Sequence, residues 1–263
     1  MTRPTILLIH GAFVTPESFK KIENYFTDRG FHTIAPPWPY HDNSKKNDRN
    51  KPAKELGNLG LSDLIEHYSK IIKSLPEKPI IIGHSFGGML TQLLMDRNLG
   101  QLGIAISPAG TKGIIGAAYP TTAIATTRIF SLPWIKTIKL SLPEFKYAFV
   151  NGLPEKEQID AYQHVVPETT KIFFESAASA FKSNTPAAVN YNNGKRGPLL
   201  MIAAEKDRLV TAKQIKKNFS FYNQNSGAIT EYKEFPNRNH WIIAQDGWEE
   251  VADYINNWIK VNI

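Results

Sequence analysis

The chain has 263 residues, of which 42% are hydrophobic, so it contains enough apolar material for a sizeable core. The absence of cysteine excludes disulfides, thiolate metal sites and a cysteine nucleophile, and it favours the cytoplasm. The formal net charge of +7 is spread along the chain without a nucleic-acid-binding motif, so we interpret it as a solvated surface and expect no nucleic acid partner.

The first predicted element is a short buried strand at residues 5–9, which opens into a turn that begins with His10 and Gly11. The N-terminus passes directly into this strand, and about five residues are too short for the apolar segment of a signal peptide. No apolar run in the sequence approaches the ~18 residues that a membrane span needs. We therefore expect a cytoplasmic protein without a membrane span. A helix is predicted next, from Thr15 to about Gly30.

A motif with chemical meaning follows a predicted buried strand at residues 79–84. Gly83, Ser85 and Gly87 match G-x-S-x-G, the pattern that places a serine on a strained turn between a strand and a helix, with its hydroxyl facing a cleft. The strand is β-branched and the apolar residues 89–95 predict the helix. Ser85 is therefore the expected nucleophile, and it requires a base, an acid that orients the base, and donors for an oxyanion.

Predicted strands alternate with helical patterns over most of the chain. Apolar residues recur about every 3.6 positions at 61–75 and 248–259, as core-facing helices require. This alternation predicts the α/β class, with a mostly parallel, doubly wound sheet of about six strands. The expected strands cover residues 5–10, 31–36, 79–84, 102–107, 199–204 and 229–235.

Residues 108–196 break the alternation and predict a helical cap inserted into a core formed by residues 1–107 and 197–263. The cap helices are expected at residues 124–130, 134–140, 155–164 and 168–182. Aromatic side chains are frequent in the cap, which predicts an apolar ceiling over the site and a moderately hydrophobic substrate. The side chains expected to line the substrate pocket are Phe13, Trp38, Trp134 and Trp241.

The expected base and acid follow the last two predicted strands. His240 comes directly after a turn that follows the strand at 229–235, which is the position where the base is expected. The loop after the preceding strand contains Asp207, which we choose as the orienting acid. Glu205 is the alternative acid, because it is closer to the strand and has a longer side chain, and Asp246 is a third candidate.

Two backbone N–H groups are expected to bind the oxyanion. One belongs to Phe86, directly after the nucleophile. The other belongs to the loop after the first strand, where we choose Ala12 as the donor, with Phe13 as the alternative. The sequence contains no metal-binding motif and no phosphate or dinucleotide fingerprint, so we expect neither a metal nor a cofactor.

These features resemble the α/β-hydrolase superfamily, from about residue 5 to the C-terminus. Residues 35–41, 83–88 and 231–236 are similar to a bacterial group of serine hydrolases and esterase-like proteins. The resemblance implies a Ser-His-Asp hydrolase but no particular substrate. The residues that it assigns to the triad and the oxyanion hole are Ser85, His240, Asp207, Ala12 and Phe86.

Two features of the sequence differ from parts of this superfamily. The fold often begins with an antiparallel hairpin, for which there is no room before residue 5. The serine at position 85 also differs from the aspartate nucleophile of the dehalogenase and epoxide-hydrolase branches.

The leading functional hypothesis is hydrolysis of carboxylic esters of small to medium hydrophobic substrates through an acyl-enzyme. The first alternative uses the same site without ester hydrolysis, as a hydroxynitrile-lyase-like, cofactor-free haloperoxidase-like or C–C-bond-cleaving enzyme. The second alternative is a ligand receptor on a hydrolase scaffold. The expected partner is a small ester-like molecule, and we expect a monomer or a homodimer.

Overall fold

The computed structural model describes residues 4–41, 53–114 and 136–263. In this part of the chain, six parallel strands form one central sheet in the order β2-β1-β3-β4-β7-β8. The predicted α/β class and six-stranded sheet are confirmed. The strands are β1 (Ile6–Ile9), β2 (Thr33–Ile34), β3 (Ile80–His84), β4 (Leu102–Ile106), β7 (Leu199–Ala204) and β8 (Thr230–Phe235).

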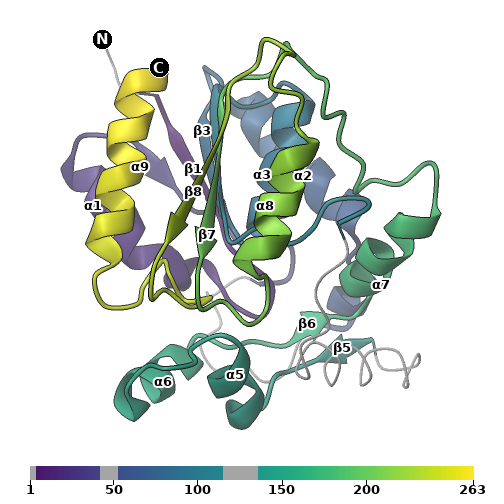
Figure 1. Ribbon diagram of the computed structural model, residues 1–263. Coiled ribbons are helices and arrows are strands. Elements are labelled where there is room, and N and C mark those ends of the chain that lie inside the picture. Colours follow the sequence, from purple (N-terminus) through teal and green to yellow (C-terminus); the bar gives the residue numbers. More distant parts are fainter. Residues whose placement is uncertain (1–3, 42–52, 115–135) are drawn as a thin grey trace.

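Helices cover both faces of this sheet (Figure 1). One face carries α1 (Lys20–Asp28) and α9 (Trp248–Asn262), and the other carries α2 (Leu61–Ser74), α3 (Phe86–Asp96) and α8 (Ala212–Phe221). Alternate strand residues point to opposite faces, so each face has its own hydrophobic cluster. In β1, for example, Ile6 and Leu8 belong to one cluster, and Leu7 and Ile9 to the other.

The first predicted helix begins later in the structure than the sequence predicts. Residues Pro16–Phe19 form a 3-10 turn, η1, and the α-helix α1 begins at Lys20. The helix ends at Asp28, and Gly30 then adopts a positive φ of 81° that glycine accommodates without strain. Shortly before α2, Lys54–Asn58 form a second 3-10 turn, η3, which buries Leu56.

The described part of the cap contains less helix than the sequence predicts. It is built from α5 (Leu142–Ala148), α6 (Glu155–Tyr162), α7 (Lys171–Ala178), the turn η4 (Ser179–Phe181) and an antiparallel pair, β5 (Thr137–Ile138) and β6 (Glu168–Thr169). The prediction of a helix at 134–140 is wrong, because the strand β5 lies within that range. The helix predicted at 168–182 begins only after the strand β6. The predicted helix at 124–130 and Trp134 lie outside the described residues.

The cap lies at the carboxyl ends of the strands. Figure 1 shows α5, α6, β5 and β6 beyond the end of the sheet to which β7 and β8 point. Backbone hydrogen bonds join the two parts: Val166 N–H donates to the Phe13 carbonyl at 2.9 Å, and Trp241 N–H donates to the Phe149 carbonyl at 3.1 Å. Phe13 follows β1 and Trp241 follows β8, so the cap is tied to the loops where the site is expected.

The strand order also determines which loops meet. From β1 the chain adds β2 on one side of the strand and β3 on the other. Loops that leave a parallel sheet at such a reversal diverge and open a crevice, which is where ligands bind in open α/β sheets. The loop after β1 and the turn after β3 therefore lie at the place where such a crevice is expected.

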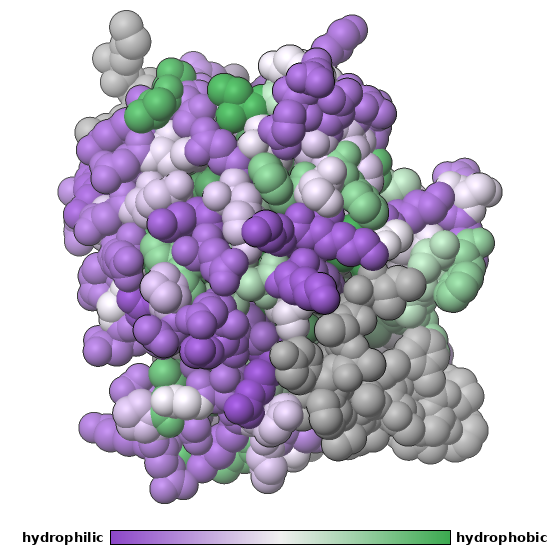
Figure 2. Space-filling view, viewed as in Figure 1, coloured by the Kyte–Doolittle hydropathy of each residue, from purple (hydrophilic) through white to green (hydrophobic). Residues whose placement is uncertain are grey.

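Hydrophilic residues cover most of the described surface in the view of Figure 2, with small apolar patches between them. No helix in the described ranges is long and apolar enough to cross a bilayer.

Candidate active site

Ser85 occupies a strained turn between β3 and α3. Its backbone has φ 57° and ψ −119°, a conformation that non-glycine residues rarely adopt. Its N–H donates to the Ile106 carbonyl at 2.9 Å, and its own carbonyl accepts the N–H groups of Met89 and Ala109. The neighbouring strand and helix thus hold the turn in this strained conformation.

The glycines around Ser85 allow β3, α3 and β1 to approach closely. A Cβ atom on Gly83 would lie 2.0 Å from the Gly87 carbonyl oxygen, and one on Gly87 would lie 2.0 Å from the Ile9 carbonyl oxygen. A Cβ on Gly11, in the loop after β1, would lie 2.8 Å from Cβ of Ser85. The loop after β1 therefore touches the turn that carries the serine.

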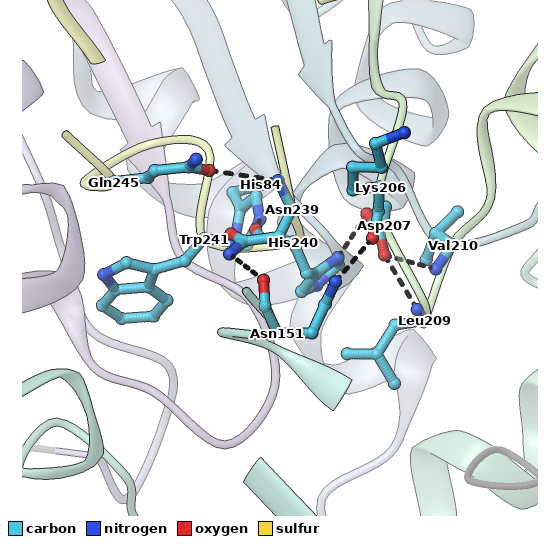
Figure 3. A network of polar contacts seen from close by, with 10 residues as sticks. All are labelled: His84, Asn151, Lys206, Asp207, Leu209, Val210, Asn239, His240, Trp241 and Gln245. Atoms are coloured by element: carbon cyan, nitrogen blue, oxygen red, sulfur yellow. Dashed lines mark hydrogen bonds and ion pairs between the residues drawn. The ribbon is translucent and has the colours of Figure 1, made fainter. Parts of the chain in front are cut away.

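Asp207 and His240 come together from the loops after β7 and β8 (Figure 3). His240 Nδ1 lies 2.7 Å from Asp207 Oδ2, and both side chains are fully buried. The N–H groups of Leu209 and Val210 donate to Asp207 Oδ1 at 2.8 and 2.9 Å. A carboxylate held in this way favours the tautomer in which His240 Nδ1 carries the proton and Nε2 has a free lone pair.

The other two candidate acids do not contact His240. Glu205 is exposed, accepts the Asn237 N–H at 2.8 Å and pairs with Lys206 at 2.9 Å. The Asn237 N–H, followed by the Lys206 ammonium, lowers the pKa of the Glu205 carboxyl. Asp246 is exposed, and only its backbone carbonyl takes part in a described hydrogen bond, with Arg238.

His84 supports His240 from the other side. Its Nε2 lies 2.8 Å from the His240 carbonyl oxygen, and the two ring centroids are 4.7 Å apart. Burial, followed by repulsion from His240, lowers the pKa of His84 well below its usual value, so the ring is neutral and donates through Nε2. The sequence carries no signal of this contact between His84 and His240. The contact arises because β3 and β8 end at the same edge of the sheet.

His240 Nε2 is buried and has no hydrogen-bond partner among the described residues. The structure therefore joins Asp207 to His240 but shows no hydrogen bond from His240 to Ser85 Oγ. His84 directly precedes Ser85 in the chain, so its contact with His240 brings the base loop next to the serine turn. Hydrogen bonds between nucleophile and base are often long without substrate and shorten in the reacting complex.

The two candidate oxyanion donors in the loop after β1 differ in their hydrogen bonding. Phe13 N–H faces the buried carboxylate of Glu168, with 3.4 Å between N and Oε2. Ala12 N–H and Phe86 N–H have no acceptor among the described residues. The geometry therefore favours Ala12 over Phe13 as the partner of Phe86.

Aromatic side chains surround the loop after β1 and the start of α3. Phe173, from α7 of the cap, stacks on Phe13 with 5.4 Å between ring centroids and meets Phe86 edge-on at 5.1 Å. The Trp38 and Phe86 rings also meet at a steep angle, with 6.5 Å between centroids. These rings enclose the two expected oxyanion donors, Ala12 and Phe86, in apolar surroundings.

The Trp241 ring packs against a different part of the cap from Phe13 and Phe86. Its ring packs against Phe145 of α5 with 6.0 Å between centroids. It also lines a surface cleft of about 470 Å³ between the core and α6, together with Lys21, Glu157 and His164. In the part of the chain that the structure describes, no cluster of three His, Asp or Glu side chains is arranged to hold a metal ion.

Comparisons with known proteins agree with this architecture. A sequence model described as the alpha/beta hydrolase family matches residues 6–254. A monoacylglycerol lipase from Paleococcus ferrophilus superposes with a TM-score of 0.71 at 19% identity, over 100% of this chain and 96% of that chain. A methylesterase from Arabidopsis superposes with a TM-score of 0.68 at 11% identity, over 98% and 100%.

A variant of tomato methylketone synthase I, complexed with β-ketoheptanoate, superposes with a TM-score of 0.67 at 15% identity, over 100% of this chain and 99% of that chain. At these identities the three structures show a shared fold. No curated protein matches the sequence.

Proposed function

The chain belongs to the alpha/beta hydrolase family, and on that premise we propose that it hydrolyses carboxylic esters of small to medium hydrophobic substrates through an acyl-enzyme. The observation that carries this proposal is the state of His240. Its Nδ1 is bonded to the buried Asp207 carboxylate, while Nε2 is unpaired beside the turn that carries Ser85. An imidazole held in this tautomer is prepared to accept a proton from a serine hydroxyl.

In the proposed reaction, Ser85 Oγ attacks the ester carbonyl carbon while its proton passes to His240 Nε2. The carbonyl oxygen becomes an oxyanion that accepts the N–H groups of Ala12 and Phe86. The imidazolium, stabilised by Asp207, then gives its proton to the alcohol oxygen as the C–O bond breaks. Water next attacks the acyl-enzyme, His240 takes the water proton, and collapse returns a proton to Ser85 and releases the acid.

Two further observations support an ester substrate. The lipase and the methylesterase among the structural neighbours are named for ester cleavage. The rings of Phe13, Phe86 and Phe173 form an apolar wall beside the expected oxyanion donors, which suits a hydrophobic acyl or alcohol group.

Rapid mixing with p-nitrophenyl butyrate tests this proposal. We expect a burst of p-nitrophenol that approaches one equivalent per protein chain, followed by slower turnover. The variant Ser85→Ala is expected to give neither phase while keeping the wild-type melting temperature. A folded wild-type protein that releases no alcohol from a panel of esters would contradict ester hydrolysis.

A second candidate function uses the same site on a different bond. The similarity to a methylketone synthase complexed with a β-keto acid favours this alternative. Product analysis on β-diketones, cyanohydrins and esters separates the two candidates. Alcohol and acid formed only from esters support the esterase, whereas cleavage of a C–C bond without ester turnover supports the alternative.

A further inference from the structure

We propose that Glu168, a residue of the cap, is a positioning residue for the oxyanion hole. It acts by holding the peptide group between Ala12 and Phe13 in one orientation. This inference rests on the proposed function, because it assigns a part in the same reaction to a residue that lies 155 positions from Phe13 in the sequence.

The Glu168 carboxylate is completely buried, and each of its oxygens faces a different backbone N–H group. Oε1 accepts the Thr169 N–H at 2.8 Å, and Oε2 lies 3.4 Å from Phe13 N and 3.5 Å from His41 Nε2. A buried carboxylate is costly unless such groups satisfy it. The carboxylate therefore joins β6 of the cap to the loop after β1.

The same short cap segment holds Phe13 at both of its backbone polar groups. Val166 N–H donates to the Phe13 carbonyl at 2.9 Å, while Glu168 accepts from the Phe13 N–H. Phe13 has a φ of 66°, in the left-handed region, which is unfavourable for a residue other than glycine. The two cap contacts offset that cost and select the strained conformation.

A second set of contacts leads from Glu168 to the start of the same loop. The His41 ring stacks on the His10 ring with 5.5 Å between centroids. His10 Nδ1 lies 2.8 Å from the Gly11 carbonyl oxygen, and His10 Nε2 accepts the backbone N–H of Trp38 at 3.0 Å. Burial, followed by repulsion from His41, lowers the pKa of His10, so the ring is neutral and its Nε2 can accept.

These contacts determine where the Ala12 N–H points. On one side, the Gly11–Ala12 peptide, which carries the Ala12 N–H, is held at its carbonyl oxygen, 2.8 Å from His10 Nδ1. On the other, the following peptide is fixed because Phe13 N–H faces Glu168. Ala12 lies between two fixed peptide groups, so its own N–H is held while that of Phe13 is turned toward the cap. Removing one oxyanion donor typically slows an enzyme about a hundred- to a thousandfold. A donor that is held less firmly should lower kcat by a smaller factor.

The variants Glu168→Gln and Glu168→Met test the inference. Glutamine keeps the size of the side chain but has one acceptor oxygen for two N–H groups, and methionine has none of comparable strength. For both variants we expect kcat on p-nitrophenyl butyrate to fall about tenfold or more, with KM within about twofold of wild type. The matched control is Glu155→Gln, which changes an exposed carboxylate elsewhere in the cap and should leave both constants unchanged.

The inhibition constant of an alkylboronic acid separates positioning from a purely structural role. The boronate adds to Ser85 Oγ and presents an oxygen to the oxyanion donors, so its affinity should fall by the same factor as kcat while the variants melt as cooperatively as wild type. Unchanged kcat and boronate affinity in a folded variant would overturn the inference and leave the esterase intact. A loss confined to KM would also overturn it, as would a failure of both variants to fold.

If one variant alone fails to fold, the other decides the question. A wild-type protein without turnover of any ester would remove the proposed function and this inference together.

Discussion

The Asp207 carboxylate is held by three hydrogen bonds, two from backbone N–H groups and one from His240. The backbone donors occupy Oδ1 and leave Oδ2 for the imidazole. Because both carboxylate oxygens are bonded, the Asp207 side chain cannot rotate freely, and it fixes the orientation of the His240 ring. Triads depend on such an arrangement, because the acid has to select one tautomer of the histidine.

The variant Asp207→Asn tests this role. The asparagine amide can present N–H to His240 Nδ1 and favour the wrong tautomer, so we expect kcat to fall by roughly a thousandfold or more. The matched control Glu205→Gln alters an exposed carboxyl group two residues away and should stay within about twofold of wild type. Steady-state kinetics on one activated ester measure both, and equal losses in the two variants would contradict the assignment.

How far the sequence alone predicts the site differs from residue to residue. Ser85 and His240 are predictable because each follows a clear strand and has a motif or turn around it. Asp207 and Glu205 share one loop, and the features that distinguish them, the contact of Asp207 with His240 and with two backbone N–H groups, exist only in the folded chain. Glu168 and His84 leave no sequence signal of a role, since their partners belong to distant segments.

At the level of elements, the turn between β3 and α3 depends on close contact with β1. The turn approaches β1 at Gly87, where an added Cβ would meet the backbone carbonyl oxygens of Ile9 and His10 at 2.0 and 2.7 Å. Backbone atoms of a buried strand cannot move aside as a flexible side chain can. The glycine is therefore required for packing as well as for the turn.

Gly87→Ala is accordingly expected to lower the free energy of unfolding by about 3 kcal/mol or more, in the range of severe overpacking. Gly152→Ala is the comparison: its Cβ would meet nothing within 4 Å, and only its φ of 81° is unfavourable, at about 1 kcal/mol. Urea unfolding of both variants measures the difference. A Gly87→Ala protein as stable as Gly152→Ala would contradict the packing described.

The cap element α7 presents Phe173 to the loop after β1 and to the start of α3. Phe173→Ala should open space beside Ser85, so we expect kcat/KM to rise for hexanoyl and octanoyl esters relative to acetyl esters. A series of p-nitrophenyl esters measures this preference. An unchanged chain-length profile would show that the ring packs the cap without bordering the substrate.

The cap is also where sequence reasoning performs least well. The four inner strands, β1, β3, β4 and β7, are predictable because every residue in them is buried and most are apolar. The strands β5 and β6 have two residues each and pair only with one another, so no periodicity reveals them. Helix α5 carries a signal that was missed: Ser141 and Glu144 form a capping box at its start.

For the whole molecule, buried neutral histidines link stability to pH. Burial lowers the pKa values of His10 and His84 well below 6.5. Below about pH 6.5 the unfolded chain binds protons at these positions that the folded chain does not, so the free energy of unfolding decreases as pH falls. Each histidine contributes about 1.4 kcal/mol per pH unit in that range.

Urea unfolding at pH 7.5, 6.5 and 5.5 measures this dependence. We expect little change between the first two values and a clear loss at the third. His84→Gln retains a donor for the His240 carbonyl. It should weaken the dependence of the free energy of unfolding on pH by about the contribution of one histidine. A free energy of unfolding that increases toward pH 5.5 would contradict the buried, neutral state of these rings.

The central claim is that the fold activates the Ser85 hydroxyl. The most direct measurement is mass spectrometry of peptides after reaction with a fluorophosphonate, on wild type and on the folded variant His240→Ala. The account predicts one adduct per chain, on the peptide that contains Ser85, and almost none in the variant within the same time. An adduct on another serine, or equal labelling without His240, would contradict it.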